Sequence, residues 1–254
     1  MIKVIINGCN GKMGQVLSYQ IRQDSELQII AGIDKNPDRF NTVFPVYDNI
    51  FSCKEKADVI IDFSKPEALE ALLDYAIKTN TPLVIATTGL SVKDMDNLKE
   101  AANKIAIFQS ANMSVGMNVL IKLAQAAAKI MEDSADIEIV ERHHNLKIDA
   151  PSGTAYLIAN KINDSLKYPK EYIFGRHSKT EKRSESEIGI HAIRGGTIVG
   201  DHTVIFAGGD EVIEMSHSAQ SKNIFALGAI KAAKFIAKKE PAFYNMDDLL
   251  QNKI

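Results

Sequence analysis

The chain has 254 residues, of which 45% are hydrophobic and 24% charged, and its formal net charge is −2. These values are ordinary for a globular protein with a buried core, and they give no reason to expect a nucleic-acid or membrane partner. No apolar run approaches the roughly 18 residues of a membrane span, and the N-terminus lacks a signal-peptide pattern, so we expect a cytoplasmic protein. Two cysteines, Cys9 and Cys53, are too few for a disulfide scaffold or a zinc cluster.

Short runs rich in Val and Ile alternate with helical stretches in the N-terminal part of the chain. This alternation predicts a Rossmann-like, doubly wound α/β domain with a parallel sheet covered on both faces. The expected strands are residues 3–7, 27–33, 58–63, 82–87 and 105–109. The expected helices are residues 13–23, 66–79 with Pro66 in the first turn, and 92–103 with Ser91 as N-cap.

The pattern changes after Asn112. A long Ala-rich helix is expected first, and the later strand-like runs are separated by Gly195-Gly196 and Gly208-Gly209, which predicts a smaller α+β domain with a mainly antiparallel sheet. The polar stretch 175–187 is expected to be an exposed loop. The helix is expected at residues 116–131, the strands at 137–144, 188–194, 197–200, 202–207 and 211–216, and a last helix near 221–239.

We therefore expect two domains. Residues 1–113, completed by a C-terminal helix within 222–254, are expected to form the dinucleotide-binding domain, and residues 114–221 the substrate-binding and oligomerisation domain.

A glycine-rich loop follows the first expected strand, with the sequence Gly8-Cys9-Asn10-Gly11-Lys12-Met13-Gly14. Glycines allow a tight turn and let backbone N–H groups approach a pyrophosphate at a helix N-terminus. The spacing matches the standard G-x-G-x-x-G fingerprint only loosely, and a plain strand-to-helix turn is the alternative. Asp34 lies 20 residues after Gly14, where a ribose-binding acid is expected, and favours the dinucleotide interpretation.

The neighbouring charges bear on which nucleotide is used. Asp34 suits the free 2′-hydroxyl of NADH, whereas Lys12, Lys35 and Arg39 could hold the 2′-phosphate of NADPH or could simply be solvated, so we expect both cofactors. Two further loops, 86–89 and 110–113, follow strands at the same sheet edge and are expected to border the nicotinamide. The expected cofactor-binding residues are Gly8, Cys9, Asn10, Gly11, Lys12, Met13, Asp34, Lys35, Ala86, Thr87, Thr88, Ser110, Ala111, Asn112 and Met113.

The densest chemistry lies in residues 141–155. His143 and Lys147 are four residues apart, a spacing that places them on one face of either a helix or a regular strand. A histidine beside a lysine can supply a proton near neutral pH, and the local positive charge suits an anionic substrate.

The next segment, Pro151-Ser152-Gly153-Thr154, precedes a helical run at residues 155–166. Backbone N–H groups at the helix start, together with two hydroxyls, can form a carboxylate site. In the alternative interpretation, Asp149 or Ser152 is only an N-cap and the histidines are surface groups.

The string Glu-x-His-His-x-x-Lys-x-Asp-Ala-Pro-Ser-Gly-Thr-Ala at 141–155 closely resembles the signature of the dihydrodipicolinate reductase family of bacterial lysine and diaminopimelate synthesis. Ala86 stands where this family often has Gly, Met113 where Phe is common, and Asp34 where Glu is frequent. Other segments fall in the family's order, namely Gly-x-x-Gly-Lys-Met-Gly, Asp62-Phe63-Ser64 with Pro66, Thr87-Thr88-Gly89, Asn112-Met113-Ser114, Arg194-Gly195-Gly196 and His217-Ser218-Ala219.

The resemblance implies NAD(P)H-dependent reduction of dihydrodipicolinate, or of its 4-hydroxy-tetrahydro form, with hydride added at C4 and a proton at C3. It implies that His143 is the proton donor and that Lys147 binds the substrate and assists. It also implies a homotetramer joined through the second domain's sheets, and domain closure about Ser114-Val115-Gly116 and the start of the last helix. The implied substrate-binding residues are His144, Lys147, Ser152, Gly153 and Thr154.

Three alternatives are weighed against this interpretation. An aspartate-semialdehyde dehydrogenase needs a nucleophilic cysteine in the second domain, but both cysteines precede it. A non-catalytic NAD(H)-binding sensor or scaffold would not need His143, Lys147 and the Ser-Gly-Thr turn together. A metal enzyme is disfavoured because the His143-His144 pair lacks a spaced partner ligand and adjacent strand side chains point to opposite faces, so we expect no metal.

Overall fold

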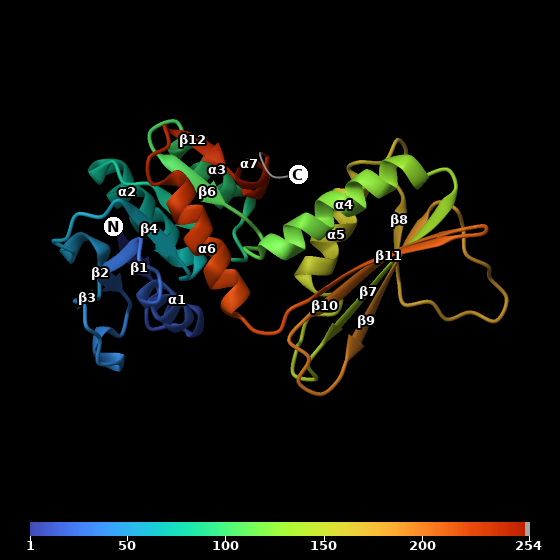
Figure 1. The fold of residues 1–254 in the computed structure, drawn as a ribbon, viewed down its shortest axis with the longest axis horizontal. Helices are drawn as coiled ribbons and strands as arrows, with labels where there is room; N and C mark the ends of the chain where they lie inside the picture. The colour runs from blue at the N-terminus through green and yellow to red at the C-terminus, as the bar shows by residue number, and fades with distance from the viewer. Residues whose placement is uncertain (252–254) are drawn as a thin grey trace. The chain divides into compact units, whose positions relative to one another are not determined.

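The computed structural model describes residues 1–251, and the chain divides into two compact units (Figure 1). Unit 1 comprises Met1–Ser114 and the chain from Lys222 onward, and unit 2 comprises Val115–Ser221. No helix among the described residues is long and apolar enough to cross a membrane.

Unit 1 is built on a parallel sheet of seven strands in the order β12-β6-β5-β4-β1-β2-β3. The five predicted strands are all present, which confirms the doubly wound α/β prediction. Pattern analysis missed the two edge strands because they are only two and three residues long. The strands are β1 (Ile2–Asn7), β2 (Leu27–Ile33), β3 (Val46–Tyr47), β4 (Val59–Asp62), β5 (Leu83–Ile85), β6 (Ala106–Gln109) and β12 (Ala242–Tyr244).

Helices cover both faces of this sheet and enclose two separate cores. Alternate residues of β1 serve the two sides: Val4 and Ile6 pack under α1 and α6, whereas Ile5 packs under α2 and α3. The predicted N-cap of α3 is confirmed, since Ser91 and Asp94 form a reciprocal capping box. The helices are α1 (Lys12–Arg22), α2 (Leu69–Thr79), α3 (Val92–Ala101), α6 (Asn223–Ile236) and α7 (Met246–Leu250), with short 3₁₀ turns at Pro37–Arg39, Ile50–Ser52 and Pro66–Ala68.

Unit 2 is a five-stranded sheet in the order β11-β10-β7-β9-β8, with two helices on one face (Figure 1). Ile137 and Ile139 of β7 point into the core beneath the helices, whereas Thr203 and Ile205 of β10 lie on the opposite, partly exposed face. The elements are α4 (Val115–Met131), β7 (Ala135–His143), α5 (Gly153–Asn163), β8 (Glu171–Phe174), β9 (Glu187–Arg194), β10 (Asp201–Gly208) and β11 (Val212–Ser218).

The second sheet is mixed rather than mainly antiparallel. β10 pairs antiparallel with β7 and β11, but β9 pairs parallel with both β7 and β8. The β10–β11 hairpin at Gly208-Gly209 is confirmed. The hairpin expected at Gly195-Gly196, between strands at 188–194 and 197–200, is wrong. Residues 197–200 form no strand, and β7 lies between β9 and β10, because periodicity does not reveal which strands are neighbours.

The segment 195–200 therefore passes around the end of β7, and its expected strand at 197–200 is part of this loop. Two backbone hydrogen bonds fasten the loop there: Gly195 N–H donates to the His143 carbonyl (2.9 Å), and Asn145 N–H donates to the Gly196 carbonyl (3.2 Å). The loop thus packs beside His143.

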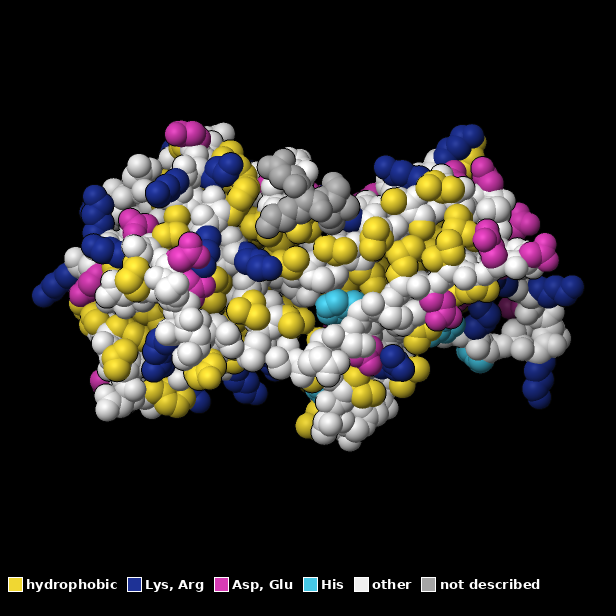
Figure 2. All heavy atoms as spheres, viewed as in Figure 1, with side chains coloured by type: hydrophobic (Ala, Val, Ile, Leu, Met, Phe, Trp, Pro, Cys, Tyr) yellow, Lys and Arg dark blue, Asp and Glu magenta, His cyan; other side chains and the backbone are white. Residues whose placement is uncertain are grey.

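The predicted polar loop between β8 and β9 is largely exposed, as expected. It is long because β8 and β9 are parallel, and parallel strands need a long return connection. Arg183 anchors it to the open face of the sheet through Asp136 (2.5 Å) and Glu138 (3.0 Å). On the face drawn in Figure 2, basic and acidic side chains are interspersed on both units, in keeping with the near-neutral net charge.

Candidate active site

The glycine-rich loop after β1 has a geometry that side chains would block. Gly8 has φ +78°, and a Cβ there would lie 2.8 Å from the Phe63 carbonyl oxygen, while a Cβ at Gly14 would lie 2.1 Å from the Gly8 carbonyl oxygen. Gly11 is the N-cap of α1, and no side chain caps this helix. The helix start is therefore bare backbone at the positive end of its dipole, which fits a pyrophosphate.

Beside the loop lies a cleft of about 530 Å³, lined in part by Asp34, Lys35 and Arg39. The Asp34 carboxylate accepts the backbone N–H groups of Asn10 (3.0 Å) and Asn36 (3.1 Å). Asp34 therefore braces the glycine-rich loop while facing the cleft, where a nucleotide ribose would need an acceptor.

Cys9 supports this loop from beneath. Its side chain is fully buried, and burial together with the nearby Asp34 charge raises the pKa of the Cys9 thiol to about 12. A thiol with this pKa is protonated and inert at neutral pH, which agrees with setting aside a thiol-dependent dehydrogenase.

The other predicted cofactor loops lie at the same carboxyl edge of the sheet. Residues 86–88 follow β5 and residues 110–113 follow β6. Ser110 Oγ donates to the Asn112 carbonyl (2.8 Å), which fixes the second of these loops.

A polar junction that the sequence pattern does not predict lies at this edge. The buried Asp62, last residue of β4, accepts hydrogen bonds from Asn7 Nδ2 (2.8 Å), Thr87 Oγ1 (2.7 Å) and Ser64 N–H (3.1 Å). It therefore links the ends of β1, β4 and the loop after β5, all of which border the predicted nucleotide site.

In unit 2, the candidate catalytic group lies at the end of β7, whose last residue is His143. His143 Nδ1 lies 2.6 Å from Glu141 Oε2. The Glu141 side chain is fully buried, and it also accepts two hydrogen bonds from the Arg194 guanidinium (2.8 Å each) and one from Ser152 N–H (2.9 Å).

These contacts set the charge of the buried acid. Burial alone would raise the pKa of Glu141, but hydrogen bonds from Arg194, His143 and Ser152 outweigh it and lower the pKa below its ordinary value. Glu141 is consequently a carboxylate at neutral pH and can only accept hydrogen bonds, so His143 Nδ1 carries a proton.

A second histidine packs against the first. The His202 ring lies 5.2 Å from the His143 ring in an edge-to-face arrangement, and His202 Nε2 lies 3.1 Å from Ser152 Oγ. Burial and the neighbouring His143 lower the pKa of His202 to about 4, so His202 is neutral at pH 7. Ser152 is the N-cap of α5, as one of the sequence alternatives proposed, and accepts Ala155 N–H (3.2 Å).

The Nε2 side of His143 has no hydrogen-bond partner among the described residues. It lies against Gly200, where a Cβ would be only 2.9 Å from Nε2. A glycine at this position leaves room at the ring nitrogen that Glu141 does not occupy.

The expectation that spacing alone puts His143 and Lys147 on one face is wrong. The strand ends at His143, and Lys147 N–H donates to the His144 carbonyl (3.1 Å) in a turn, so neither helical nor strand periodicity applies. Lys147 Nζ pairs instead with the Asp149 carboxylate (2.8 Å). His144 is partly exposed in this loop, and Gly153 and Thr154 begin α5.

The site therefore includes three residues that were not predicted as site residues from the sequence: Glu141, Arg194 and His202. A signal was present: Glu141 follows Ile137 and Ile139 on the core-facing side of β7, and His202 alternates in the same way with Val204 and Phe206 of β10. A charged or titratable side chain in a core-facing position usually has a specific partner, because leaving it unpaired would be costly.

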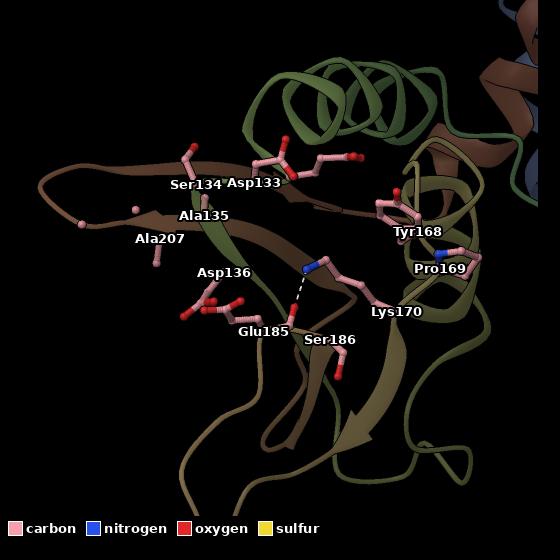
Figure 3. Close-up of a pocket in the computed structure, with 13 residues that line it drawn as sticks. Asp133, Ser134, Ala135, Asp136, Tyr168, Pro169, Lys170, Glu185, Ser186 and Ala207 are labelled. Atoms are coloured by element: carbon pink, nitrogen blue, oxygen red, sulfur yellow. Dashed lines mark hydrogen bonds between the residues drawn. The ribbon is translucent and has the colours of Figure 1, made fainter.

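A cavity of about 560 Å³ at the other end of unit 2 lies apart from this site (Figure 3). Asp136, near the start of β7, lines it, and Lys170 Nζ reaches the Glu185 carbonyl across it (2.5 Å). None of the sequence-predicted site residues lines this cavity.

A doubly wound sheet with a bare glycine-rich helix start, in a chain that also carries a buried histidine–carboxylate pair, is typical of a nicotinamide-nucleotide oxidoreductase. Two family models match nearly the whole chain: "Dihydrodipicolinate reductase, N-terminus" over residues 2–113 and "Dihydrodipicolinate reductase, C-terminus" over residues 116–250. The chain belongs to the dihydrodipicolinate reductase family, which confirms the resemblance found in the sequence.

Curated relatives agree over their full lengths. The chain is 55% identical to the 4-hydroxy-tetrahydrodipicolinate reductase of Caldanaerobacter subterraneus subsp. tengcongensis, with 99% of each chain covered. It is 46% identical to the reductase of the same name from Clostridium novyi (strain NT), with 100% of each covered.

Among solved structures, the dipicolinate-bound dihydrodipicolinate reductase from Paenisporosarcina sp. TG-14 matches with a TM-score of 0.83 at 24% identity, covering 100% of both chains. A probable dehydrogenase from Thermotoga maritima matches with a TM-score of 0.62 at 13% identity, covering 98% of this chain and 93% of that one. At these identities the likeness shows a shared fold. The chain is an oxidoreductase with a nucleotide-binding Rossmann unit and a small-molecule substrate.

Proposed function

We propose that the chain reduces dihydrodipicolinate, or its 4-hydroxy-tetrahydro form, to tetrahydrodipicolinate in diaminopimelate and lysine biosynthesis. The observation that carries this proposal is the sequence of residues 141–155. In the structure it contains a buried histidine, His143, in contact with the Glu141 carboxylate, and it leads into the start of α5. When bound, NAD(P)H supplies the hydride that joins C4, and a proton from the protein completes the reduction at C3.

His143 is the proton donor in this proposal. Its Nδ1–H is engaged by Glu141, so Nε2 is the nitrogen that can reach a substrate carbon. A positioned imidazole of this kind suits proton transfer near neutral pH. Lys147 binds the substrate and assists the transfer by exchanging its contact with Asp149 for a substrate carboxylate.

The substrate carboxylates are bound at the start of α5 and in the loop before it. Backbone N–H groups in the first turn of a helix, at the positive end of its dipole, favour anions. Gly153 and Thr154 provide such groups, Ser152 provides the capping hydroxyl, and His144 contributes from the preceding loop.

Unit 1 is the dinucleotide-binding domain and unit 2 the substrate-binding and oligomerisation domain in this proposal. Both NADH and NADPH are used: Asp34 accepts the ribose hydroxyl, and Lys35 and Arg39 of the same cleft offset the 2′-phosphate charge. The nucleotide contacts come from the loop 8–13, Asp34 and Lys35, and the loops 86–88 and 110–113.

We further propose a homotetramer that packs through the open face of the unit 2 sheet, where Ile205 is only partly buried in one chain. Sedimentation equilibrium should give the mass of four chains. Ile205→Arg should reduce that mass, and Leu123→Arg, on an exposed position of α4, should not. A monomer at every concentration tested would contradict this assembly.

The experiment that tests the activity is an NADH and NADPH oxidation assay in which a dihydrodipicolinate synthase supplies fresh substrate. One nucleotide should be oxidised for each substrate molecule consumed, and tetrahydrodipicolinate should accumulate. Nucleotide binding without any oxidation would instead support the non-catalytic alternative.

A further inference from the structure

Glu141 is a fully buried carboxylate that makes four hydrogen bonds to groups on three separate segments. Its Oε2 accepts from His143 Nδ1 and from Arg194, and its Oε1 accepts from Ser152 N–H and again from Arg194. The two carboxylate oxygens together accept four hydrogen bonds from protein donors, so Glu141 has no acceptor position left for substrate.

We propose that Glu141 is a positioning residue: it keeps a proton on His143 Nδ1, so that Nε2 is always the nitrogen that delivers a proton to the substrate. The proposal rests on the proposed function, in which His143 is the donor. Because a carboxylate cannot donate, the neutral ring that remains after transfer has its lone pair on Nε2, ready to take up the next proton.

Glu141 also holds the turn at Ser152, where α5 begins and where the substrate carboxylates are proposed to bind. Glu141 Oε1 accepts the N–H of Ser152, the N-cap of α5, while Oε2 orients His143. One rigid side chain thus sets the donor nitrogen relative to the helix start that binds the substrate carboxylates. Proton transfer depends on such alignment at the level of fractions of an ångström.

His143 lies near one negative and one positive side chain, and these two charges affect its protonation in opposite directions. The proposal can therefore be tested by the direction of the change when each charge is removed. Glu141 on β7 stabilises the imidazolium, Arg194 on β9 opposes it, and His202 on β10 is neutral at pH 7. Removing the acid and removing the guanidinium should therefore shift the protonation of His143 in opposite directions. A loss of packing alone would not move the protonation of His143 in opposite directions in the two variants. Lys147 and Asp149 pair with each other, Asp149 contacts Arg194 through its carbonyl, and Arg142 pairs with Asp201 where β7 and β10 lie side by side.

The test compares the kcat–pH profiles of Glu141→Gln and Arg194→Met with that of the parent enzyme. In Glu141→Gln one oxygen becomes an NH₂ group, which faces either His143 Nδ1 or the N–H of Ser152. In either orientation one of these two donors loses its acceptor. We expect kcat to fall about 10- to 100-fold and the alkaline limb to move down by about one pH unit or more. In Arg194→Met the alkaline limb should move up.

The chain offers a matched control in Glu138, three residues earlier on β7 and on the opposite face. Glu138 Oε2 also contacts a histidine nitrogen, His191 Nε2, at 2.6 Å, and Glu138 also pairs with arginines. Glu138→Gln makes the same chemical change away from His143. It should leave the alkaline limb where the parent has it, with the oligomeric mass checked in parallel.

A second readout does not depend on turnover. The ¹⁵N shifts of the imidazole nitrogens should show neutral His143 as the Nδ1–H tautomer in the parent and should show a shift toward Nε2–H in Glu141→Gln, with His143→Gln used to assign the signals. If the unpaired Arg194 guanidinium prevents Glu141→Gln from folding, Glu141→Gln/Arg194→Met removes both charges together and is measured instead.

The outcomes separate the two proposals. An inactive parent would overturn the proposed function, whatever the tautomer. An active parent whose Glu141→Gln form keeps the parental alkaline limb, a kcat within about twofold and the Nδ1–H tautomer would overturn the role of Glu141 and leave the reductase activity standing.

Discussion

Glu141 Oε2 lies 2.6 Å from His143 Nδ1, and both side chains point to the core-facing side of β7. A Cβ at Gly200 would lie 2.9 Å from the opposite ring nitrogen, Nε2. The imidazole is thus held on one side by a carboxylate, and on the other side it lies next to a position without a side chain.

Gly200→Ala should lower kcat/KM by about 10- to 1,000-fold, because the methyl group would displace the ring or cover Nε2. Unfolding curves in urea would establish that the variant is folded, and titration calorimetry would show whether NADH binding is retained. Gly209→Ala is the control, since a Cβ there has no atom within 4 Å. A folded Gly200→Ala enzyme with the parental kcat/KM would mean that Nε2 does not face the substrate.

Asp34→Asn should change the cofactor preference. The amide oxygen can still accept one backbone N–H of the loop, but the charge that disfavours a 2′-phosphate is gone. We expect the ratio of the NADPH and NADH dissociation constants to fall about tenfold, as measured by calorimetry. Asp38→Asn, just outside this cleft, serves as the control. Equal weakening of both nucleotides would argue against a ribose contact.

His202 gives the structure a specific sensitivity to acid. Its pKa is about 4 in the folded protein against an ordinary value of 6.5, because burial and the His143 ring oppose its charge. The unfolded chain therefore takes up a proton that the folded chain does not, so this contribution to stability is full above pH 6.5 and is lost as the pH falls toward 4.

His202→Gln, which can still bond Ser152, should remove that dependence. Between pH 7 and pH 4 the free energy of unfolding of the parent should fall by about 2–3 kcal/mol more than that of the variant, as measured by urea denaturation. His177→Gln, in the exposed loop, should keep the parental slope. Equal slopes for the parent and His202→Gln would show that His202 titrates normally in the folded protein.

The nucleotide unit was largely predictable from the sequence because buried parallel strands are continuous apolar runs with glycine turns between them. β1, β4 and the N-cap at Ser91 followed from local patterns alone. The Asp62 junction did not, because its partners Asn7 and Thr87 lie 55 and 25 residues away in the chain.

Unit 2 was predicted less well for the same reason. The glycines at 195–196 marked a turn correctly, but they could not show that β7 lies between β9 and β10. His143 was chosen from its neighbours in sequence, whereas Arg194 and His202 reach it only through sheet pairing. The candidate donor was therefore predictable, and the network that orients it was not.

Lys147→Ala should weaken substrate binding and also slow turnover. Removing the cation should raise KM for the substrate and lower kcat by about 10²-fold, because both binding and assisted proton transfer lose a charge. Affinity for NADH should be unchanged. The exposed Lys179→Ala in the polar loop is the control, and an unchanged KM for Lys147→Ala would place this lysine outside the site.

The central claim is that His143 supplies the proton that completes the reduction. Its most direct test is single-turnover formation of tetrahydrodipicolinate with bound NADH by the parent and by His143→Gln, with substrate generated by the synthase and NADH affinity measured in parallel. We predict a rate of product formation about 10²- to 10⁴-fold lower in His143→Gln with NADH binding intact. A folded His143→Gln enzyme that forms tetrahydrodipicolinate at the parental rate would contradict the claim.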